Sequence, residues 1–206
     1  MTSPAESLVL HALRCAGHAG TPRVADAAGL AEADAESHLI DLAVAGLVTR
    51  SPGVGGAWGL TGEGRAEDAR RTARELDAAG ARDALLALYG RFMVLNPELL
   101  ELCSAWQLRP ETGAAGTVAP NDHSDPAYDA RVLGRFADLD RRAEVVGTEL
   151  SALLPRFGRY RVRLAAALAR VRSGELEHLT DSTTSYHAVW FQLHEDLLAT
   201  LGMPRW

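Results

Sequence analysis

The chain has 206 residues, enough for one large domain or two small ones, each with a buried core. Its formal net charge is −6, and all 21 basic residues are arginines. The acidic balance argues against indiscriminate nucleic-acid binding, because affinity for the phosphate backbone comes from basic side chains. The lack of lysine excludes a Schiff-base nucleophile and a Walker-type phosphate lysine.

The two cysteines, Cys15 and Cys103, lie in apolar segments with helical patterns and form no C-x-x-C pair. We interpret both as ordinary buried thiols of a reducing compartment and expect no zinc finger. The first residues lack the basic region of a signal peptide, and nothing approaches the roughly eighteen apolar residues of a membrane span. The sequence therefore predicts a soluble, cytoplasmic protein with no membrane partner.

The first third of the sequence has the pattern of three short helices. Ser3, Pro4 and Glu6 are typical of the N-cap, first and third positions of a helix. Gly29 is expected to form the turn between the second helix and a third, which should cover about 32–45.

Two strand-like runs, 47–50 and 57–61, follow the third helix and flank a tip rich in proline and glycine. The glycines of the tip, Gly53 among them, supply the unusual dihedral angles that a hairpin turn needs. Three helices followed by a hairpin predict a winged helix-turn-helix domain over residues 1–65.

The segments AGLVTR and AWGLTGEGR, residues 45–50 and 57–65, resemble the strand-wing-strand ending of MarR-type bacterial winged-helix regulators. In that family an aromatic-x-Leu-Thr-x-x-Gly-Arg segment leads into a long helix. The resemblance covers about a third of the chain. It implies a winged-helix fold and transcriptional regulation through DNA binding by a homodimer.

Residues 66–80 are charged nearly all round, with opposite charges at i, i+4 spacing, and predict a solvated connecting helix. Residues 81–206 predict an all-helical bundle, because no convincing strand pattern follows the wing. The fold class is therefore mainly α. The expected helices of the bundle cover 81–95, 97–107, 126–154, 160–172 and 183–201, with a loop over 109–125. Asp125 and Pro126 are typical of the N-cap and first position of the helix over 126–154.

The third helix should be the recognition helix, yet most of its exposed positions are acidic. Helices that bind DNA present Arg, Lys, Asn, Gln or Ser to base edges and phosphates. One interpretation is therefore that the winged helix is a protein-interaction or dimerisation platform, since a fold alone does not fix a function. The other is DNA binding, for which the candidate contacts are Ser37, His38, Arg50, Arg65, Arg70 and Arg71.

Two polar-aromatic segments of the second domain, 121–131 and 186–195, suggest a shared small-molecule pocket. A hydrogen-bonded structural core is the alternative. A metal site would need His123 or Asp129 with only one of His187 and His194, which lie about 10 Å apart along a helix; we assign no metal ligand and name no cofactor. The candidate ligand-binding residues are Trp106, Asp122, His123, Tyr128, Asp129, Arg159, Arg163, Tyr186, His187, Trp190 and His194.

An arginine run without one acid covers residues 156–172. It would suit a phosphate, a carboxylated ligand or an acidic partner. The alternative is that these arginines pair with acids of neighbouring helices and cover apolar surface with their stems.

The wording NDHSDPAYD and YHAVWFQLHEDLL, in 121–129 and 186–198, resembles uncharacterised helical segments of actinobacterial proteins, some attached to pyruvate phosphate dikinase-like enzymes. That resemblance implies a partner that handles phosphate or carboxylate, and it carries no assigned catalytic residue.

Three functions follow from these patterns. The first is a bacterial transcriptional regulator that binds operator DNA as a homodimer and senses a small or anionic ligand through its helical domain. The second is an accessory protein whose acidic winged helix docks on a partner enzyme. The third and weakest is an enzyme with a histidine or Asp129 as general acid or base, because the sequence contains no complete catalytic signature.

Overall fold

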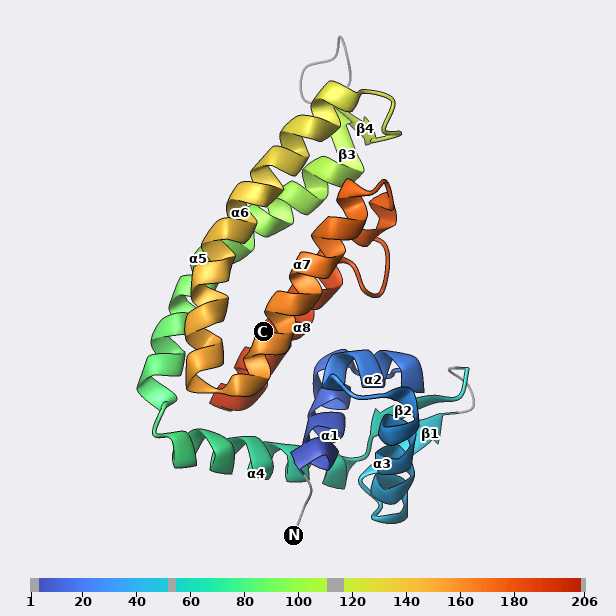
Figure 1. The fold of residues 1–206 in the computed structure, drawn as a ribbon, viewed down its shortest axis with the longest axis vertical. Helices are drawn as coiled ribbons and strands as arrows, with labels where there is room; N and C mark the ends of the chain where they lie inside the picture. Colours follow the sequence, from blue (N-terminus) through green and yellow to red (C-terminus); the bar gives the residue numbers. More distant parts are fainter. Residues whose placement is uncertain (1–3, 52–54, 111–116, 205–206) are drawn as a thin grey trace. The chain divides into compact units, whose positions relative to one another are not determined.

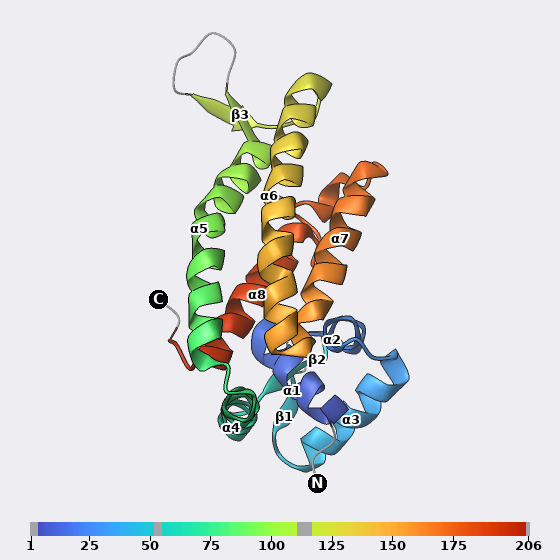
Figure 2. The same cartoon turned by 60° about the vertical axis from the view of Figure 1, so that its left-hand side comes forward.

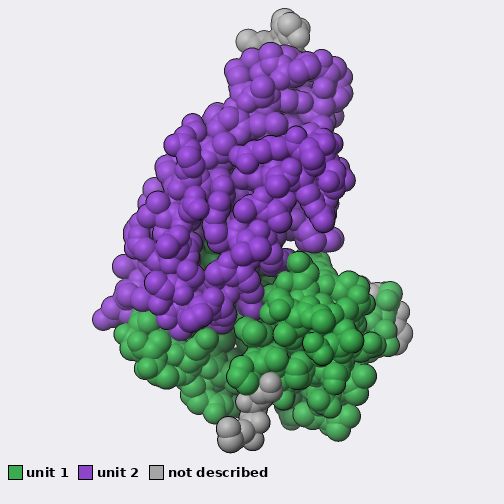
Figure 3. All heavy atoms as spheres, viewed as in Figure 1, with its two compact units in different colours: residues 1–82, 192–206 green, residues 83–191 purple. Residues whose placement is uncertain are grey.

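The computed structural model describes residues 4–51, 55–110 and 117–204, and this part is mainly α-helical, as the sequence predicts (Figure 1). The Ser3 N-cap and the tip residues 52–54 lie outside it. The chain divides into two compact units, Met1–Arg82 with Gln192–Trp206, and Asp83–Phe191 (Figure 3). Among the described helices, none has both the length and the apolar character that a membrane crossing requires.

Unit 1 begins with three helices and a hairpin. Their packed face buries apolar side chains such as Leu13, Leu39 and Trp58 in one core. The elements are α1 (Pro4–Ala16), α2 (Thr21–Ala28), α3 (Glu32–Val44), β1 (Val48–Ser51), β2 (Ala57–Leu60) and α4 (Gly62–Ala79).

The turn and hairpin of unit 1 follow the sequence pattern. Gly29 ends α2 in the left-handed conformation, with φ of 70°, which glycine adopts without a steric penalty. β1 pairs antiparallel with β2, so that Val48 lies opposite Leu60. Ala19, in the α1–α2 connection, exchanges two backbone hydrogen bonds with Trp58. This order of elements is compatible with a winged helix.

A junction at Thr61 fixes the hairpin against α4. The Thr61 hydroxyl accepts a hydrogen bond from the Gly64 backbone N–H, which caps α4, and the Thr61 N–H donates to the Leu47 carbonyl. A Cβ atom at position 64 would overlap the Leu47 carbonyl oxygen. The Leu-Thr-x-x-Gly pattern noted in the sequence thus has a physical basis here, a capping hydroxyl and a close backbone approach.

The helix α4 differs from the predicted solvated connector. Asp68, Thr72 and Leu76 are buried on one face, and the helix packs against α1. The i, i+4 pair Glu67–Arg71 is itself only slightly exposed, and the helical spacing of the buried residues was hidden by the polarity of Asp68 and Thr72. Unit 1 therefore extends beyond the predicted domain boundary, and it also includes the residues from Gln192 onward.

Unit 2 is a helical bundle in which α5, α6 and α7 run side by side (Figures 1 and 2). α8 contributes its residues up to Phe191. The elements that form or enter this unit are α5 (Arg82–Gln107), β3 (Leu108–Pro110), β4 (Val118–Pro120), α6 (Pro126–Leu153), the short 3-10 helix η2 (Pro155–Phe157), α7 (Gly158–Arg172), the 3-10 helix η3 (Leu176–His178) and α8 (Tyr186–Leu201).

Two expectations for the bundle are wrong. The predicted break before Pro97 is absent, since α5 continues through that residue, with Leu95 and Leu99 both buried. Burial on both sides of the proline outweighs the lost backbone hydrogen bond, which costs about 3 kcal/mol. Part of the predicted loop forms a hairpin, in which Leu108 pairs with Pro120. The predicted N-cap Asp125, by contrast, is confirmed and accepts bonds from two backbone N–H groups of α6.

The close approach at Gly64 generates a stability prediction. Gly64→Ala should destabilise the protein by roughly 2–4 kcal/mol, because the new methyl must displace the Leu47 carbonyl. Gly62→Ala is the matched control, since its Cβ meets nothing within 4 Å, and it should change stability by less than about 1 kcal/mol. Urea unfolding of both variants measures the difference; equal free energies of unfolding would contradict the junction.

Candidate functional site

The solvent-exposed side of α3, which we call the α3 face, combines acidic and apolar side chains. Ile40 is 51% exposed and Val44 is 86% exposed, one helical turn apart. Ala35, Leu39 and Leu42 anchor the opposite side in the core. The exposed acids of the α3 face are Glu32, Asp34, Glu36 and Asp41, and no cation occurs between Glu32 and Val44.

Part of this acidity has a structural role. Glu32 and Asp34 lie in the first turn of α3, where negative side chains stabilise the positive end of the helix dipole. Glu36 and Asp41 lie beyond that turn and gain nothing from it. These two acids, beside the apolar pair Ile40 and Val44, are the part of the face that the helix itself does not require.

The wing arginine predicted to contact DNA is engaged within the hairpin. Arg50 donates from Nε to the Gly56 carbonyl at 2.9 Å, and its guanidinium lies 5.4 Å from the centre of the Trp58 ring. Ser37 is exposed, His38 is half-buried and Arg65 is exposed. The predicted DNA role of these four residues remains a prediction.

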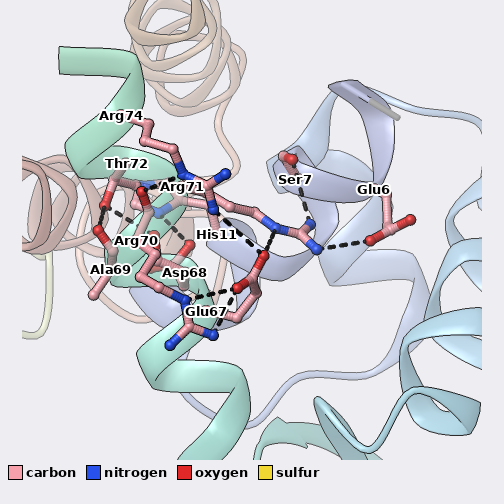
Figure 4. Close-up of polar contacts among 10 residues, drawn as sticks. All are labelled: Glu6, Ser7, His11, Glu67, Asp68, Ala69, Arg70, Arg71, Thr72 and Arg74. Atoms are coloured by element: carbon pink, nitrogen blue, oxygen red, sulfur yellow. Dashed lines mark hydrogen bonds and ion pairs between the residues drawn. The ribbon is translucent and has the colours of Figure 1, made fainter. Parts of the chain in front are cut away.

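The arginines of α4 gather around one carboxylate (Figure 4). Glu67 accepts hydrogen bonds from Arg70 and from Arg71, both at 2.7 Å at their closest. Arg71 also reaches Glu6 on α1, at 3.0 Å. The pKa of the Glu67 carboxyl is lowered, mainly by its hydrogen bond from Arg71 and less by the one from Arg70. Two of the cations predicted to meet DNA phosphates are therefore already paired with acids of unit 1.

Five of the predicted ligand residues lie around the β3–β4 hairpin in unit 2. His123 contacts Asp129 through Nδ1 at 3.0 Å, and its ring centre is 4.5 Å from that of Trp106. The Tyr128 hydroxyl donates to the Ala105 carbonyl at 2.7 Å. Asp122 accepts from Ser124, which lowers the pKa of its carboxyl, and lies 3.1 Å from Arg109. These side chains bond to one another and to nearby backbone.

A second network in unit 2 is centred on Asp140. The Tyr186 hydroxyl donates to Asp140 Oδ1 at 3.1 Å, and Arg161 grips the same carboxylate through both terminal nitrogens, at 2.6 and 3.1 Å. The pKa of Tyr186 is raised well above its usual value, mainly by burial of the hydroxyl and to a smaller extent by the negative charge of Asp140. Neither Asp140 nor the pairing of Arg161 was predicted from the sequence, because the register between α6 and α7 leaves no sequence signal.

Trp190 continues this core. Its indole N–H donates to Asn96 Oδ1 at 3.0 Å, and its ring stacks on Phe92 with centres 4.6 Å apart. Asn96 was also missed; an amide directly before Pro97, on the buried side of an apolar helix, is the signal that could have found it. An aromatic-polar core of this kind fits the structural alternative for Tyr186 and Trp190.

The other predicted ligand residues are distributed along α7 and α8. Arg159 lies over the Tyr160 ring at 5.5 Å, and Arg163 is buried. His187 is half-buried in unit 2, whereas His194 is half-buried in unit 1. Their role in ligand binding stays a prediction. Within the arginine run, Arg161 pairs with an acid of a neighbouring helix, Asp140 on α6, as the second interpretation of the run expects.

A surface pocket of about 400 Å³ occurs in unit 2, and none of the predicted ligand residues lines it. Its walls are mainly alanine and leucine, with one ion pair between Arg91 and Glu149 at 2.6 Å. The lining residues are Ala84, Ala87, Leu88, Arg91, Glu149, Ala152 and Leu153.

Two groups of side chains hold metal-ligand atoms close together in the described residues. Glu175, Glu177 and His178 form one at the surface of unit 2, and His11, Cys15 and Asp196 form another inside unit 1. Neither group was predicted from the sequence. The second could have been suspected from the spacing of His11 and Cys15, because residues four apart on a helix lie on the same face.

Comparison with known proteins adds no assignment: no family model, curated protein or solved structure matches this chain.

The buried hydroxyl of Tyr186 generates a pH prediction. Its pKa is raised in the folded chain, whereas an unfolded tyrosine titrates near pH 10. The folded state thus holds this proton more tightly, so the stabilisation is complete below about pH 10 and is lost as the pH rises further.

Tyr186→Phe removes the hydroxyl, and with it the coupling between loss of this proton and unfolding. Urea unfolding of both proteins between about pH 8 and pH 11 should show the unmodified chain losing up to about 1.4 kcal/mol more stability per pH unit than the variant at the alkaline end. Parallel curves for the two proteins would show that Tyr186 does not titrate with unfolding.

Proposed function

We propose that unit 1 is a winged helix-turn-helix used for docking on a protein, and that the chain is an accessory protein of a partner enzyme. The α3 face carries this proposal: in a winged helix the third helix would be the recognition helix, yet here it presents four acids around Ile40 and Val44. An exposed apolar pair within a charged rim is the general form of a protein-interaction surface.

Charge argues against nucleic acid as the occupant of this face. The phosphate backbone of DNA is attracted by cations that release its counterions, and α3 offers none. The nearest predicted substitutes, Arg70 and Arg71, both pair with Glu67, and Arg71 also pairs with Glu6. Placing α3 in a major groove would bring Glu36 and Asp41 close to phosphates with no compensating charge.

The same charge specifies the partner. Its contact surface should carry arginine or lysine side chains around an apolar centre, because opposite potentials favour encounter and orientation. A second copy of the α3 face would meet its own acids, and like charges across an interface cost several kcal/mol. We therefore place a different, basic protein on this face.

Operator binding with ligand sensing by the helical domain is the second candidate function. It is favoured by the order of elements, in which α3 follows the Gly29 turn and the hairpin follows α3, an order that bacterial regulators use for DNA. In this case Ser37 and the exposed Arg65 would be the remaining contacts.

Site-specific photo-crosslinking in the native host tests the docking proposal. A photoreactive residue at position 44 should capture a discrete basic protein, while the same residue at position 94 should not, since Val94 is a comparably exposed valine on α5. Glu36→Lys combined with Asp41→Lys should weaken the complex by roughly tenfold or more, because both electrostatic contacts are inverted.

A DNA arm of the same experiment separates the candidates. A fragment of the protein's own promoter should not shift at low salt. A shift with steep salt dependence that Arg65→Ala abolishes, together with no capture at position 44, would overturn docking in favour of operator binding.

A further inference from the structure

The interior of unit 1 contains three side chains whose ligand atoms converge. His11 and Cys15 lie one turn apart on α1, and Asp196 lies on α8, within the part of that helix that belongs to unit 1. His11 Nε2 is 3.6 Å from Cys15 Sγ and 3.0 Å from Asp196 Oδ1. All three atoms fall within 4.8 Å of one another, and the residues are 3%, 4% and 0% exposed.

These separations are those of ligands around one small cation. Zinc binds imidazole nitrogen at about 2.0–2.1 Å and thiolate sulfur at about 2.3 Å, so two such ligands at a tetrahedral angle lie about 3.6 Å apart. That is the separation between His11 Nε2 and Cys15 Sγ. The shorter distance to Asp196 Oδ1 corresponds to a narrower angle and needs only a few tenths of an ångström to open.

The surroundings of the group match the outer shell of a metal site. The other ring nitrogen of His11, Nδ1, contacts Asp68 Oδ1 at 2.9 Å, and Asp68 is itself 2% exposed. The hydroxyl of Thr200 lies 2.7 Å from the Asp196 backbone carbonyl oxygen and 3.0 Å from Asp196 Oδ1, so its one proton can be donated to either acceptor. Carboxylates that orient a metal-binding imidazole, and donors that fix a metal-binding carboxylate, are the usual second shell of zinc.

A hydrogen-bonded histidine between two aspartates would by itself account for Asp68 and Asp196. The i, i+4 spacing on α1 brings the Cys15 thiol to ligand distance from the same nitrogen. The thiol, the imidazole and the carboxylate together form a donor set that suits zinc.

We propose that His11, Cys15 and Asp196 bind one zinc ion, with Asp68 orienting the imidazole. Most structural zinc sites have four protein ligands; here three leave the fourth tetrahedral position to a water molecule or a small anion that the core would enclose with the ion. The near-complete burial of all three residues assigns the ion a structural role, joining α1 to the α8 segment of unit 1. This proposal does not depend on what the α3 face binds.

The second cysteine provides an internal control. Cys103 is a buried thiol of unit 2, and burial raises its pKa to about 12. A thiol must lose its proton to bind a metal, so Cys103 is disfavoured as a ligand. His18, which is exposed, is the matching control for His11.

Metal analysis of the full-length protein tests the site. After chelator treatment and dialysis against zinc, the unmodified chain, Cys103→Ser and His18→Ala should each retain one zinc per chain, and Cys15→Ser should retain none. Asp68→Asn should keep the stoichiometry but bind zinc roughly 10–100-fold more weakly, as expected for loss of an outer-shell partner.

Cobalt binding by the unmodified chain tests the site even if some of the variants do not fold. Co²⁺ bound at the site should produce a thiolate-to-metal charge-transfer band in the near ultraviolet, present in Cys103→Ser. Absence of saturable metal binding by the unmodified chain would overturn the proposal and leave a metal-free hydrogen-bonded group. A charge-transfer band that survives in folded Cys15→Ser would overturn it equally.

Discussion

The imidazole of His11 lies between two buried carboxylates, with Asp68 on one ring nitrogen and Asp196 on the other, at 2.9 and 3.0 Å. The three residues come from α1, α4 and α8, and they join distant parts of the sequence inside unit 1. Removing ionised groups from water costs several kcal/mol for each ion unless their partners are well placed. The remaining geometry of unit 1 has to satisfy this constraint.

That constraint explains why α4 belongs to unit 1 and is not a free connector. Asp68 faces His11, and the Thr72 hydroxyl donates a hydrogen bond to the Asp68 backbone carbonyl. On the same helix Arg71 pairs with Glu67 and with Glu6 of α1, and the exposed Arg70 also pairs with Glu67 (Figure 4). Arg70 and Arg71 are thus paired with acids of α4 and α1, and α3 itself has no cation to balance its exposed acids.

Unit 2 uses polar groups differently. Asp140 joins Arg161 to Tyr186 inside the bundle, and Asn96 receives the Trp190 indole N–H. Buried polar groups with satisfied partners fix the relative register of packed helices, because each mismatch would leave an unpaired group in an apolar interior. A ligand that bound among these side chains would have to replace bonds that the bundle already makes.

The sequence by itself determined the helical class, the order of three helices and a hairpin, and the turns and caps at Gly29 and Asp125. Such features depend on local dihedral preferences and on spacing along one segment. It also showed that α3 is acidic, which is the main support for the docking proposal. The segment that resembles the regulators includes Leu60, Thr61 and Gly64. The structure shows what two of them do: the Thr61 hydroxyl caps α4, and Gly64 allows the close approach of the Leu47 carbonyl.

Tertiary structure alone decided which polar groups are buried and with whom. The sequence does not show that His11 meets Asp68 and Asp196, since these residues are 57 and 185 positions away. Nor does it show that Arg161 pairs with Asp140, or that α5 continues past Pro97. The reason is physical: local patterns state what a residue prefers, whereas desolvation and packing against distant segments determine what it contacts.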